Sequence, residues 1–201
     1  GRIASAIFTA NVRGDAENIG GVIEADKALL LNVGGNFTSG STTRTTSVVL
    51  DGYRRTDTTL DRKGLLYVKG EDGTLRVAAK NIDLNGADMI NEGRGLTLLS
   101  AQQDLRLGTV SVGVEENMGE GDHYRNTALH DVVISRVAGK GDVQLQAGNI
   151  YSTGASLEAE KRLIALADND LVLGSVTRAS EYEEYHHNET RSTFAKSSET
   201  S

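Results

Sequence analysis

The sequence repeats itself with a period of 66–68 residues, and this repeat limits the fold more than any other feature. Segments 36–40, 104–108 and 170–174 each begin with Asn or Asp and end with Gly, and their starting residues lie 68 and 66 residues apart. A period of this kind is typical of solenoids, in which each unit buries its apolar face only against a neighbouring unit. We therefore expect stacked units rather than a closed globular core.

A shorter period of about 20 residues lies inside each unit. Segment 75–79 precedes segment 96–98 by 21 residues, and segment 143–147 precedes Leu163 by 20. Three strands of about four residues fit one turn of a parallel β-helix, whereas two helices do not fit in this length. Leucine-rich repeats share the period, but their fixed leucine and asparagine spacing is missing. Segment 155–167 has helical periodicity, yet its repeat partners do not, so we interpret it as strands.

A β-helix of this size has a narrow interior in which alternate side chains of each strand point inward. We expect Leu98 and Leu145 to be inward-facing and the aligned segments 29–31, 96–98 and 163–165 to share one phase. The scarcity of aromatic residues, 4% of the chain, and the absence of proline agree with such a core and with amides that donate to neighbouring coils.

The last part of each unit is polar and contains tyrosine. Segments 42–62, 110–131 and 176–201 are predicted to be antiparallel hairpins that extend from the coils, one per unit. The fold class is therefore all-β: a right-handed parallel β-helix with coils of about 20–22 residues and protruding hairpins. We expect a single fragment of a much larger protein over residues 1–201, with units at about 1–62 (partial), 63–130 and 131–201.

Composition excludes several classes of protein. The chain has no cysteine, so disulfides and thiolate chemistry are excluded. Its formal net charge of −7 argues against a general nucleic-acid partner, which needs basic clusters for phosphate. No run of 18 apolar residues occurs, and residues 1–6 lack the apolar centre of a signal peptide, so an exported form is expected to be an internal or processed piece.

The sequence resembles the haemagglutinin repeats of filamentous haemagglutinin-type exoproteins. Three segments carry the resemblance: 96–109, 163–175, and the charged tail at 181–187 with its tyrosines and histidines. The closest similarity is to the second repeat region of contact-dependent growth inhibition effectors. It covers nearly the whole chain, with residues 1–22 matching least. Asn-Pro motifs of the family's secretion domain are absent, as is a C-terminal toxin.

The resemblance implies a non-enzymatic filament segment of a secreted protein, displayed on the surface of a Gram-negative bacterium by two-partner secretion. In growth-inhibition members this region assists delivery of a C-terminal toxin to neighbouring bacteria. The expected partners are the neighbouring coils and the target-cell outer membrane or a surface receptor. A host-directed adhesin that binds glycan or a receptor is the main alternative, and a polysaccharide-degrading β-helix enzyme is a third.

The candidate contact surface is a set of tyrosines in the predicted hairpins, since tyrosine is favoured in recognition surfaces. Its members are Tyr53, Tyr124, Tyr182 and Tyr185. The alternative interpretation is cross-strand packing between stacked hairpins, which we favour on the residues alone.

Metal, catalytic and cofactor sites are not expected. Candidate metal ligands are His186 and His187 with Glu183, Glu184 and Glu189, and separately His123 and His130. Adjacent histidines on a strand point to opposite faces, so a solvated hairpin explains the first group better. Candidate catalytic carboxylates are Asp104 with Asp170, or Glu115 with Glu116. Turn capping at repeated corners explains the aspartates.

Overall fold

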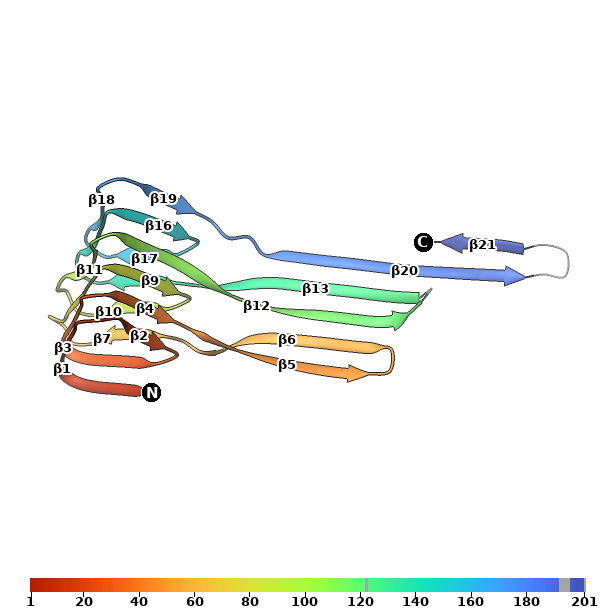
Figure 1. Ribbon diagram of the computed structural model, residues 1–201, viewed down its shortest axis with the longest axis horizontal. Helices are drawn as coiled ribbons and strands as arrows, with labels where there is room; N and C mark the ends of the chain where they lie inside the picture. Colours follow the sequence, from red (N-terminus) through yellow and green to blue (C-terminus); the bar gives the residue numbers. More distant parts are fainter. Residues whose placement is uncertain (122, 192–195, 201) are drawn as a thin grey trace. The chain divides into compact units, whose positions relative to one another are not determined.

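The structure is a computed structural model that describes residues 1–121, 123–191 and 196–200. Its regular elements are all β-strands (Figure 1). In this described part, no helix is long and apolar enough to cross a membrane. The chain forms two compact units. We name residues 1–43, 60–110 and 133–176 the coil unit, and residues 44–59, 111–132 and 177–201 the hairpin unit. Of the segment predicted at 176–201, residues 192–195 and 201 lie outside the described residues.

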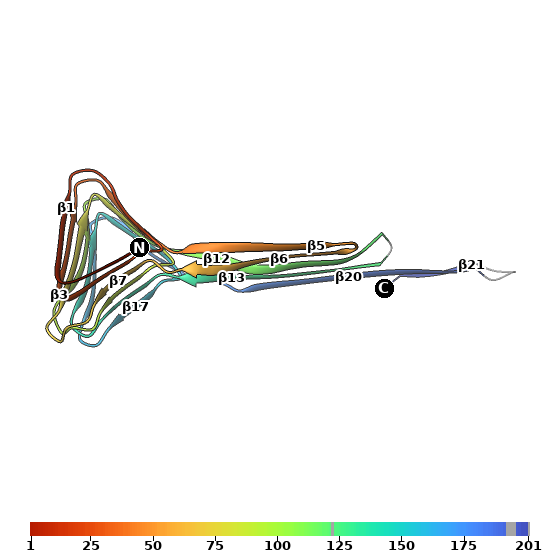
Figure 2. The same ribbon diagram turned by 90° about the horizontal axis from the view of Figure 1, so that it is seen from below.

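The coil unit contains a ten-stranded, all-parallel sheet that curls until it is nearly closed (Figure 2). Its strands are β1 (Arg2–Val12), β3 (Val22–Val33), β7 (Leu65–Val68), β8 (Thr74–Ala79), β10 (Asp88–Asn91), β11 (Thr97–Ala101), β14 (Arg136–Gly139), β15 (Val143–Ala147), β17 (Ser156–Ala159) and β18 (Leu163–Ala167). The long strand β3 pairs with β7 through its first residues and with β8 through its last. Segment 155–167 is therefore two strands, β17 and β18, as predicted.

A second set of parallel strands completes each turn of the coil unit. These strands are β2 (Ala16–Ile19), β4 (Asn36–Gly40), β9 (Asn81–Asn85), β12 (Asp104–Glu120), β16 (Asn149–Thr153) and β19 (Leu171–Gly174). They pair in the order β2-β4-β9-β12-β16-β19. The prediction of an all-β fold with stacked parallel strands is confirmed, and the arrangement is consistent with a parallel β-solenoid.

The distance in sequence between stacked residues alternates between two values. At one corner of successive coils, Asn36 lies 21 residues after Asp15, and Asn81 lies 45 residues after Asn36. Asp104 follows 23 residues later, and Asn149 follows 45 residues after that. Each long step, of 45 residues, includes one coil and one hairpin, whereas each short step, of 21 or 23 residues, is one coil alone. A short and a long step together give the 66–68-residue period.

Glycine forms the tight corner on the coils that have no hairpin. Gly20, Gly86 and Gly154 have φ values of 58°, 62° and 71°, a region that a Cβ atom disfavours. A Cβ atom on Gly154 would also lie 2.6 Å from the side chain of Val176. These corners turn the chain directly into the next strand of the coil.

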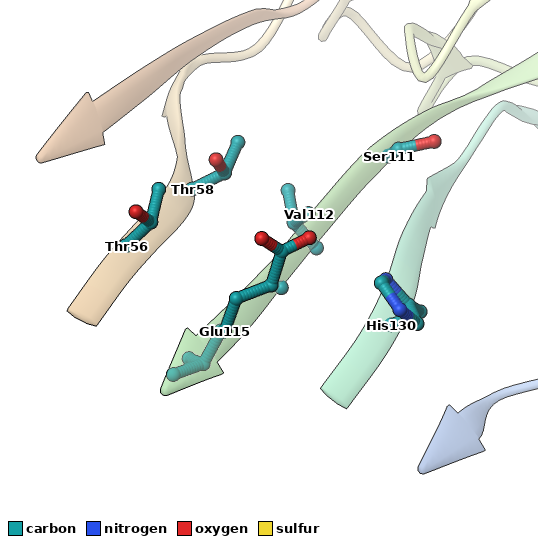
Figure 3. Close-up of a pocket in the computed structure, with 8 residues that line it drawn as sticks. Thr56, Thr58, Ser111, Val112, Glu115 and His130 are labelled. Carbon is teal, nitrogen blue, oxygen red and sulfur yellow. The ribbon is translucent and has the colours of Figure 1, made fainter. Parts of the chain in front are cut away.

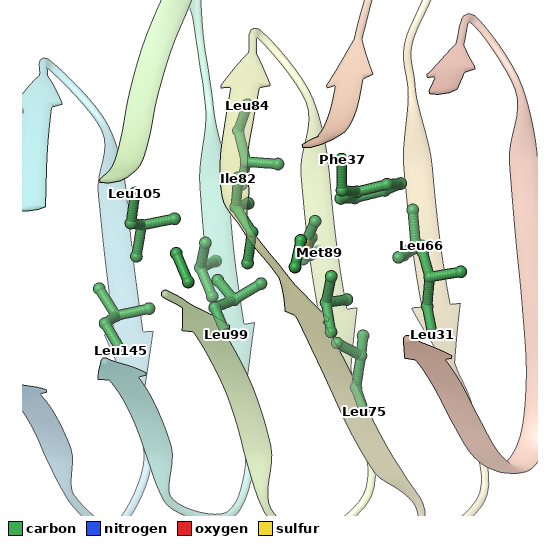
Figure 4. Packing of buried hydrophobic residues seen from close by; sticks show 14 of the residues in the cluster. Leu31, Phe37, Leu66, Leu75, Ile82, Leu84, Met89, Leu99, Leu105 and Leu145 are labelled. Carbon is green, nitrogen blue, oxygen red and sulfur yellow. The ribbon is translucent and has the colours of Figure 1, made fainter. Parts of the chain in front are cut away.

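The core is a set of apolar columns that run from coil to coil. Leu31, Val77, Leu99 and Leu145 are register partners in one column, and each is at most 4% exposed. Figure 4 shows Leu99 and Leu145 pointing into the same interior as Leu75. Because each of these four side chains packs against its register partner in the next coil, all four positions of the column are aliphatic.

Leu145 is buried as predicted, but the prediction for Leu98 is wrong. Thr97 and Leu99 are buried, and Leu98 between them points outward and is only partly buried. Leu29 stacks through Leu75 on Thr97, so the alignment of segment 29–31 with 96–98 is one residue out of phase. The sequence cannot fix this phase because residues 98 and 99 are both leucine, so no polar residue indicates which of the two points outward.

An asparagine and aspartate ladder follows one corner of the coils. The Asn36 amide nitrogen donates to Asp15 Oδ1 at 2.7 Å, and Asn81 Nδ2 donates to Asn36 Oδ1 at 2.8 Å. The Asp104 amide donates to Asn81 Oδ1 at 3.0 Å, and Asn149 Nδ2 donates to Asp104 Oδ1 at 2.8 Å. No two aspartates are neighbours in this ladder, so every carboxylate has an amide donor beside it.

Charged side chains alternate in sign along the outside of the coil unit. Backbone hydrogen bonds place Asp26, Lys69, Glu92, Lys140 and Glu160 at equivalent positions of successive coils. Lys69 Nζ lies 3.1 Å from Asp26 Oδ1, and Lys140 Nζ lies 2.7 Å from Glu92 Oε2. The hydrogen bond to Glu92 raises the pKa of Lys140. Stacking at a coil spacing of about 4.8 Å would be repulsive if these charges were alike.

The hairpin unit is a sheet in the strand order β5-β6-β12-β13-β20-β21. It adds β5 (Thr42–Leu50), β6 (Tyr53–Arg62), β13 (His123–Ile134), β20 (Ala179–Arg191) and β21 (Lys196–Thr200). Each extension therefore contributes two strands to this sheet. Strand β6 pairs antiparallel with β12, and β13 pairs antiparallel with β20, so successive hairpins bond to each other.

The inward phase can be tested with two adjacent substitutions. Leu99→Asp buries a carboxylate in the column of Leu31 and Leu145, which costs several kcal/mol, so we expect aggregation or loss of cooperative unfolding. Leu98→Asp places the same group on the outer side and is expected to cost less than about 1 kcal/mol. Denaturant unfolding followed by far-ultraviolet circular dichroism measures both. Equal destabilisation by the two variants would contradict the phase.

The ladder can be tested through its pH dependence. Asn149→Asp places three carboxylates in succession with Asp104 and Asp170, at about 4.8 Å per coil. The repulsion raises carboxyl pKa values in the folded state, so we expect a loss of about 1–3 kcal/mol at neutral pH that disappears as pH falls below about 4. Asn149→Ser is the control: it removes the amide without adding charge and should be destabilised equally at both pH values. A pH-independent Asn149→Asp variant would contradict the ladder.

Candidate contact surface

Alternation along the strands divides the four candidate tyrosines between two faces of the hairpin sheet. Tyr53 lies two residues before Arg55, and Tyr182 lies two residues before Glu184, so each shares a face with that charged residue. Tyr124 and Tyr185 are direct register partners on the opposite face. The four tyrosines therefore do not form one surface. Their role as a contact surface stays a prediction.

The first face, which we name the charged face, has a row of alternating charges across four strands. Arg55 Nη1 lies 3.3 Å from Glu116 Oε2, and Glu116 Oε1 lies 3.4 Å from Arg125 Nη2. Arg125 is in turn the register partner of Glu184. Because the four residues come from β6, β12, β13 and β20, the row connects three successive hairpins. Cross-strand pairs of opposite charge stabilise a sheet and select its register.

Several hydrogen bonds fix the side chains around this row. Arg55 donates to both carboxylate oxygens of Asp57, at 2.9 and 3.0 Å, and the bond lowers the pKa of Asp57. Tyr53 Oη donates to Glu116 Oε2 at 3.1 Å. Tyr182 donates to Glu184, which is the main reason why the pKa of Glu184 is lowered. Tyr182 nevertheless remains 64% exposed, so its ring is available for contact.

The opposite face, which we name the tyrosine face, contains a stacked aromatic pair. The rings of Tyr124 and Tyr185 lie 5.6 Å apart between centroids, with 24° between their planes. Tyr124 Oη donates to Glu183 Oε1 at 3.1 Å, and Asn126 Nδ2 donates to Glu183 Oε2 at 3.2 Å. The bond to Glu183 raises the pKa of Tyr124. This pair therefore makes the cross-strand packing that the sequence indicated as the alternative interpretation.

A shallow depression lies beside Gly113 in the hairpin unit (Figure 3). Thr56 and Thr58 of β6, Glu115 of β12 and His130 of β13 line it. Its volume of about 210 Å³ is smaller than an ordinary ligand pocket. A Cβ atom on Gly113 would lie 2.2 Å from the Leu129 carbonyl oxygen, so the glycine is needed for close packing of the strands. The depression follows from that packing.

The candidate carboxylates do not converge. Asp104 is part of the ladder, where it accepts from Asn149, and Asp170 occupies the equivalent corner of the next coil. Glu116 belongs to the row on the charged face, whereas its neighbour Glu115 lines the depression on the other face. Asp104 therefore has a structural role in the ladder.

The histidines are arranged differently from the sequence-based expectation. His123 and His186 are direct partners across β13 and β20, and their Nδ1 atoms are 3.3 Å apart. His186 Nε2 lies 2.6 Å from Glu184 Oε1. His187 follows in sequence and His130 lines the depression. The side chain of Glu189 lies outside the described part of the structure. Within that part, no group of three or more His, Cys, Asp or Glu side chains is arranged to hold a metal ion.

Comparisons with protein-family models, with curated proteins and with solved structures give no match for this chain. The class that the fold itself defines is an all-β protein with a large parallel sheet.

The sequence gives no direct signal for the row on the charged face. Neighbours in the row, such as Arg55 and Glu116, are separated by up to 61 residues, and they meet only because one hairpin pairs with the next. The recurrence of the extensions in each unit indicates stacking, but the register of one hairpin on another depends on side chains that vary between units. Glu116 and Arg125 were therefore missed as partners.

The row can be tested by charge reversal. Arg125→Glu places a third carboxylate between Glu116 and Glu184, and like charges on neighbouring strands destabilise a sheet. We expect a lower midpoint when unfolding is followed by tyrosine fluorescence, which reports mainly on this unit because it holds four of the six tyrosines. High salt should reduce the difference, since exposed charges are screened. Arg54→Glu, on the other face, is the control. An equal effect of both reversals would contradict the row.

Proposed function

We propose that this chain is a non-enzymatic filament segment of a large secreted bacterial surface exoprotein. In this proposal the coils form a right-handed parallel β-helix, and a hairpin protrudes after every second coil. The handedness follows from the strong preference of parallel crossover connections for that hand. The hairpins supply the contact surface for the target-cell outer membrane or a receptor, and the coils contact neighbouring coils of the same filament.

The exposed apolar end of the last coil is the observation that supports a filament most directly. Leu163, Leu171 and Leu173 are 47%, 49% and 67% exposed, although their register partners in the preceding coil are buried. A solenoid needs either a polar capping repeat or a further coil on such a surface. The exposed leucines favour a further layer of strands packed on this surface, because β18 and β19 have the same apolar pattern as the buried strands that they pair with.

Delivery of a toxin to neighbouring bacteria is the specific function that we favour. Its support is the resemblance of segments 96–109 and 163–175, and of the charged tail at 181–187, to the second repeat region of growth-inhibition effectors. In this setting the parent protein is secreted by a Gram-negative bacterium and displayed on its surface. The alternative, a host-directed adhesin, would use the same tyrosines and charged rows to bind glycan or a receptor.

The proposal can be tested by removing one hairpin in the parent protein. Residues 112–130 are replaced by a Gly-Asn-Gly turn, whose glycines can adopt the positive φ values found at the corners Gly86 and Gly154. We expect secretion and surface display to persist, because the coil unit holds the core. Killing of neighbouring bacteria should fall at least about tenfold, measured in mixed cultures against display-matched wild type.

Two further outcomes separate the alternatives. If killing is unchanged while attachment to host cells falls, the adhesin is the correct function. If display, killing and attachment are all unchanged, the hairpins do not supply the contact surface. Tyr182→Ser, which removes an exposed ring without shortening the strand, is the matched variant for a contact role. An unaffected Tyr182→Ser variant together with a defective hairpin replacement would assign the role to residues 112–130 rather than to Tyr182 of β20.

A further inference from the structure

His123 and His186 form a pair whose geometry is close to that of two metal ligands. They come from different hairpins, 63 residues apart, and face each other directly across β13 and β20. Their Nδ1 atoms are 3.3 Å apart. Two imidazole nitrogens that bind one zinc ion tetrahedrally at 2.0–2.1 Å are separated by about 3.3–3.4 Å. The two exposed rings now share a hydrogen bond through these atoms, and rotation of the rings would direct both Nδ1 lone pairs at an ion between them.

Glu184 prepares His186 for this role. Its carboxylate accepts a hydrogen bond from His186 Nε2 at 2.6 Å, which places the proton on Nε2 and leaves a lone pair on Nδ1. A carboxylate on the far nitrogen of a ligating histidine is the usual outer contact in metal sites, where it fixes the ring and increases its basicity. Tyr182 donates to the same carboxylate and holds it in place.

We propose that His123 and His186 bind a divalent transition-metal ion, of the class of Zn²⁺ or Cu²⁺, with water in the remaining positions. Both imidazoles are neutral in the bound form. The proton on His123 Nδ1 is exchanged through water to its Nε2, so no other protein group is required. The ion joins the second hairpin to the third and thereby stabilises the hairpin sheet. This proposal is independent of the proposed function of the filament.

Calorimetric titration of the 201-residue chain with Zn²⁺ in a non-coordinating buffer tests the site. We expect one ion per chain at about pH 7.5 and an affinity that falls at least about tenfold at about pH 5.5, because ligating imidazoles must be unprotonated. His123→Asn and His186→Asn should each weaken binding at least about tenfold. His130→Asn, on the same strand as His123 but outside the pair, is the control and should bind as wild type does.

Glu184→Ala tests the positioning role and is expected to weaken binding by about 10–100-fold with both ligands still present. A second measurement does not depend on any variant: the electron paramagnetic resonance spectrum of the Cu²⁺-loaded chain should show two nitrogen ligands. The proposal is overturned if the His123→Asn/His186→Asn double variant binds Zn²⁺ as wild type does. A spectrum without two nitrogens, or equal loss of binding in His130→Asn, would also overturn it.

Discussion

Backbone pairing between successive coils is the interaction on which the rest of the structure depends. A strand of four or five residues is not stable alone, and it gains partners on both sides only when coils stack at about 4.8 Å. Stacking in register forces equivalent residues into contact along the whole unit. The apolar columns, the corner ladder and the alternating charges are three consequences of that one constraint. Each side chain must therefore be compatible with the side chains at the equivalent positions of the two neighbouring coils.

The constraint explains which residues tolerate repetition and which must alternate. Leucine stacks on leucine and asparagine on asparagine, because amide side chains both donate and accept. Carboxylates cannot follow one another, and the ladder separates Asp104 from Asp170 by Asn149. Similarly, Lys69 and Lys140 each follow an acidic residue. Long insertions are accepted only at a corner, where a hairpin takes the place of the tight turn that Gly86 makes on the other coils.

The repeat allowed much of the coil unit to be predicted, because its signal, a corner residue before an apolar strand, is local. Which of Leu98 and Leu99 points inward could not be predicted, since both are equally apolar. One residue more or fewer in the preceding corner exchanges the inward and outward positions of the strand. The arrangement of the candidate contact surface could be predicted only in part. The sequence identified the tyrosines and histidines individually, but the partners of Tyr124 and His123 lie about 60 residues away on another hairpin. No local pattern encodes that pairing.

The central claim is that strands on either side of a hairpin are paired in register, and an engineered disulfide tests it directly because the chain has no cysteine. Leu98 and Gln144 are outward-facing register partners on β11 and β15. Leu98→Cys/Gln144→Cys should oxidise readily, since adjacent strands place Cα atoms within the 4.4–6.8 Å that a disulfide requires. Leu98→Cys/Gln146→Cys, displaced by two residues, should remain reduced. Oxidation of the displaced pair in preference to the register pair would contradict the stacked arrangement.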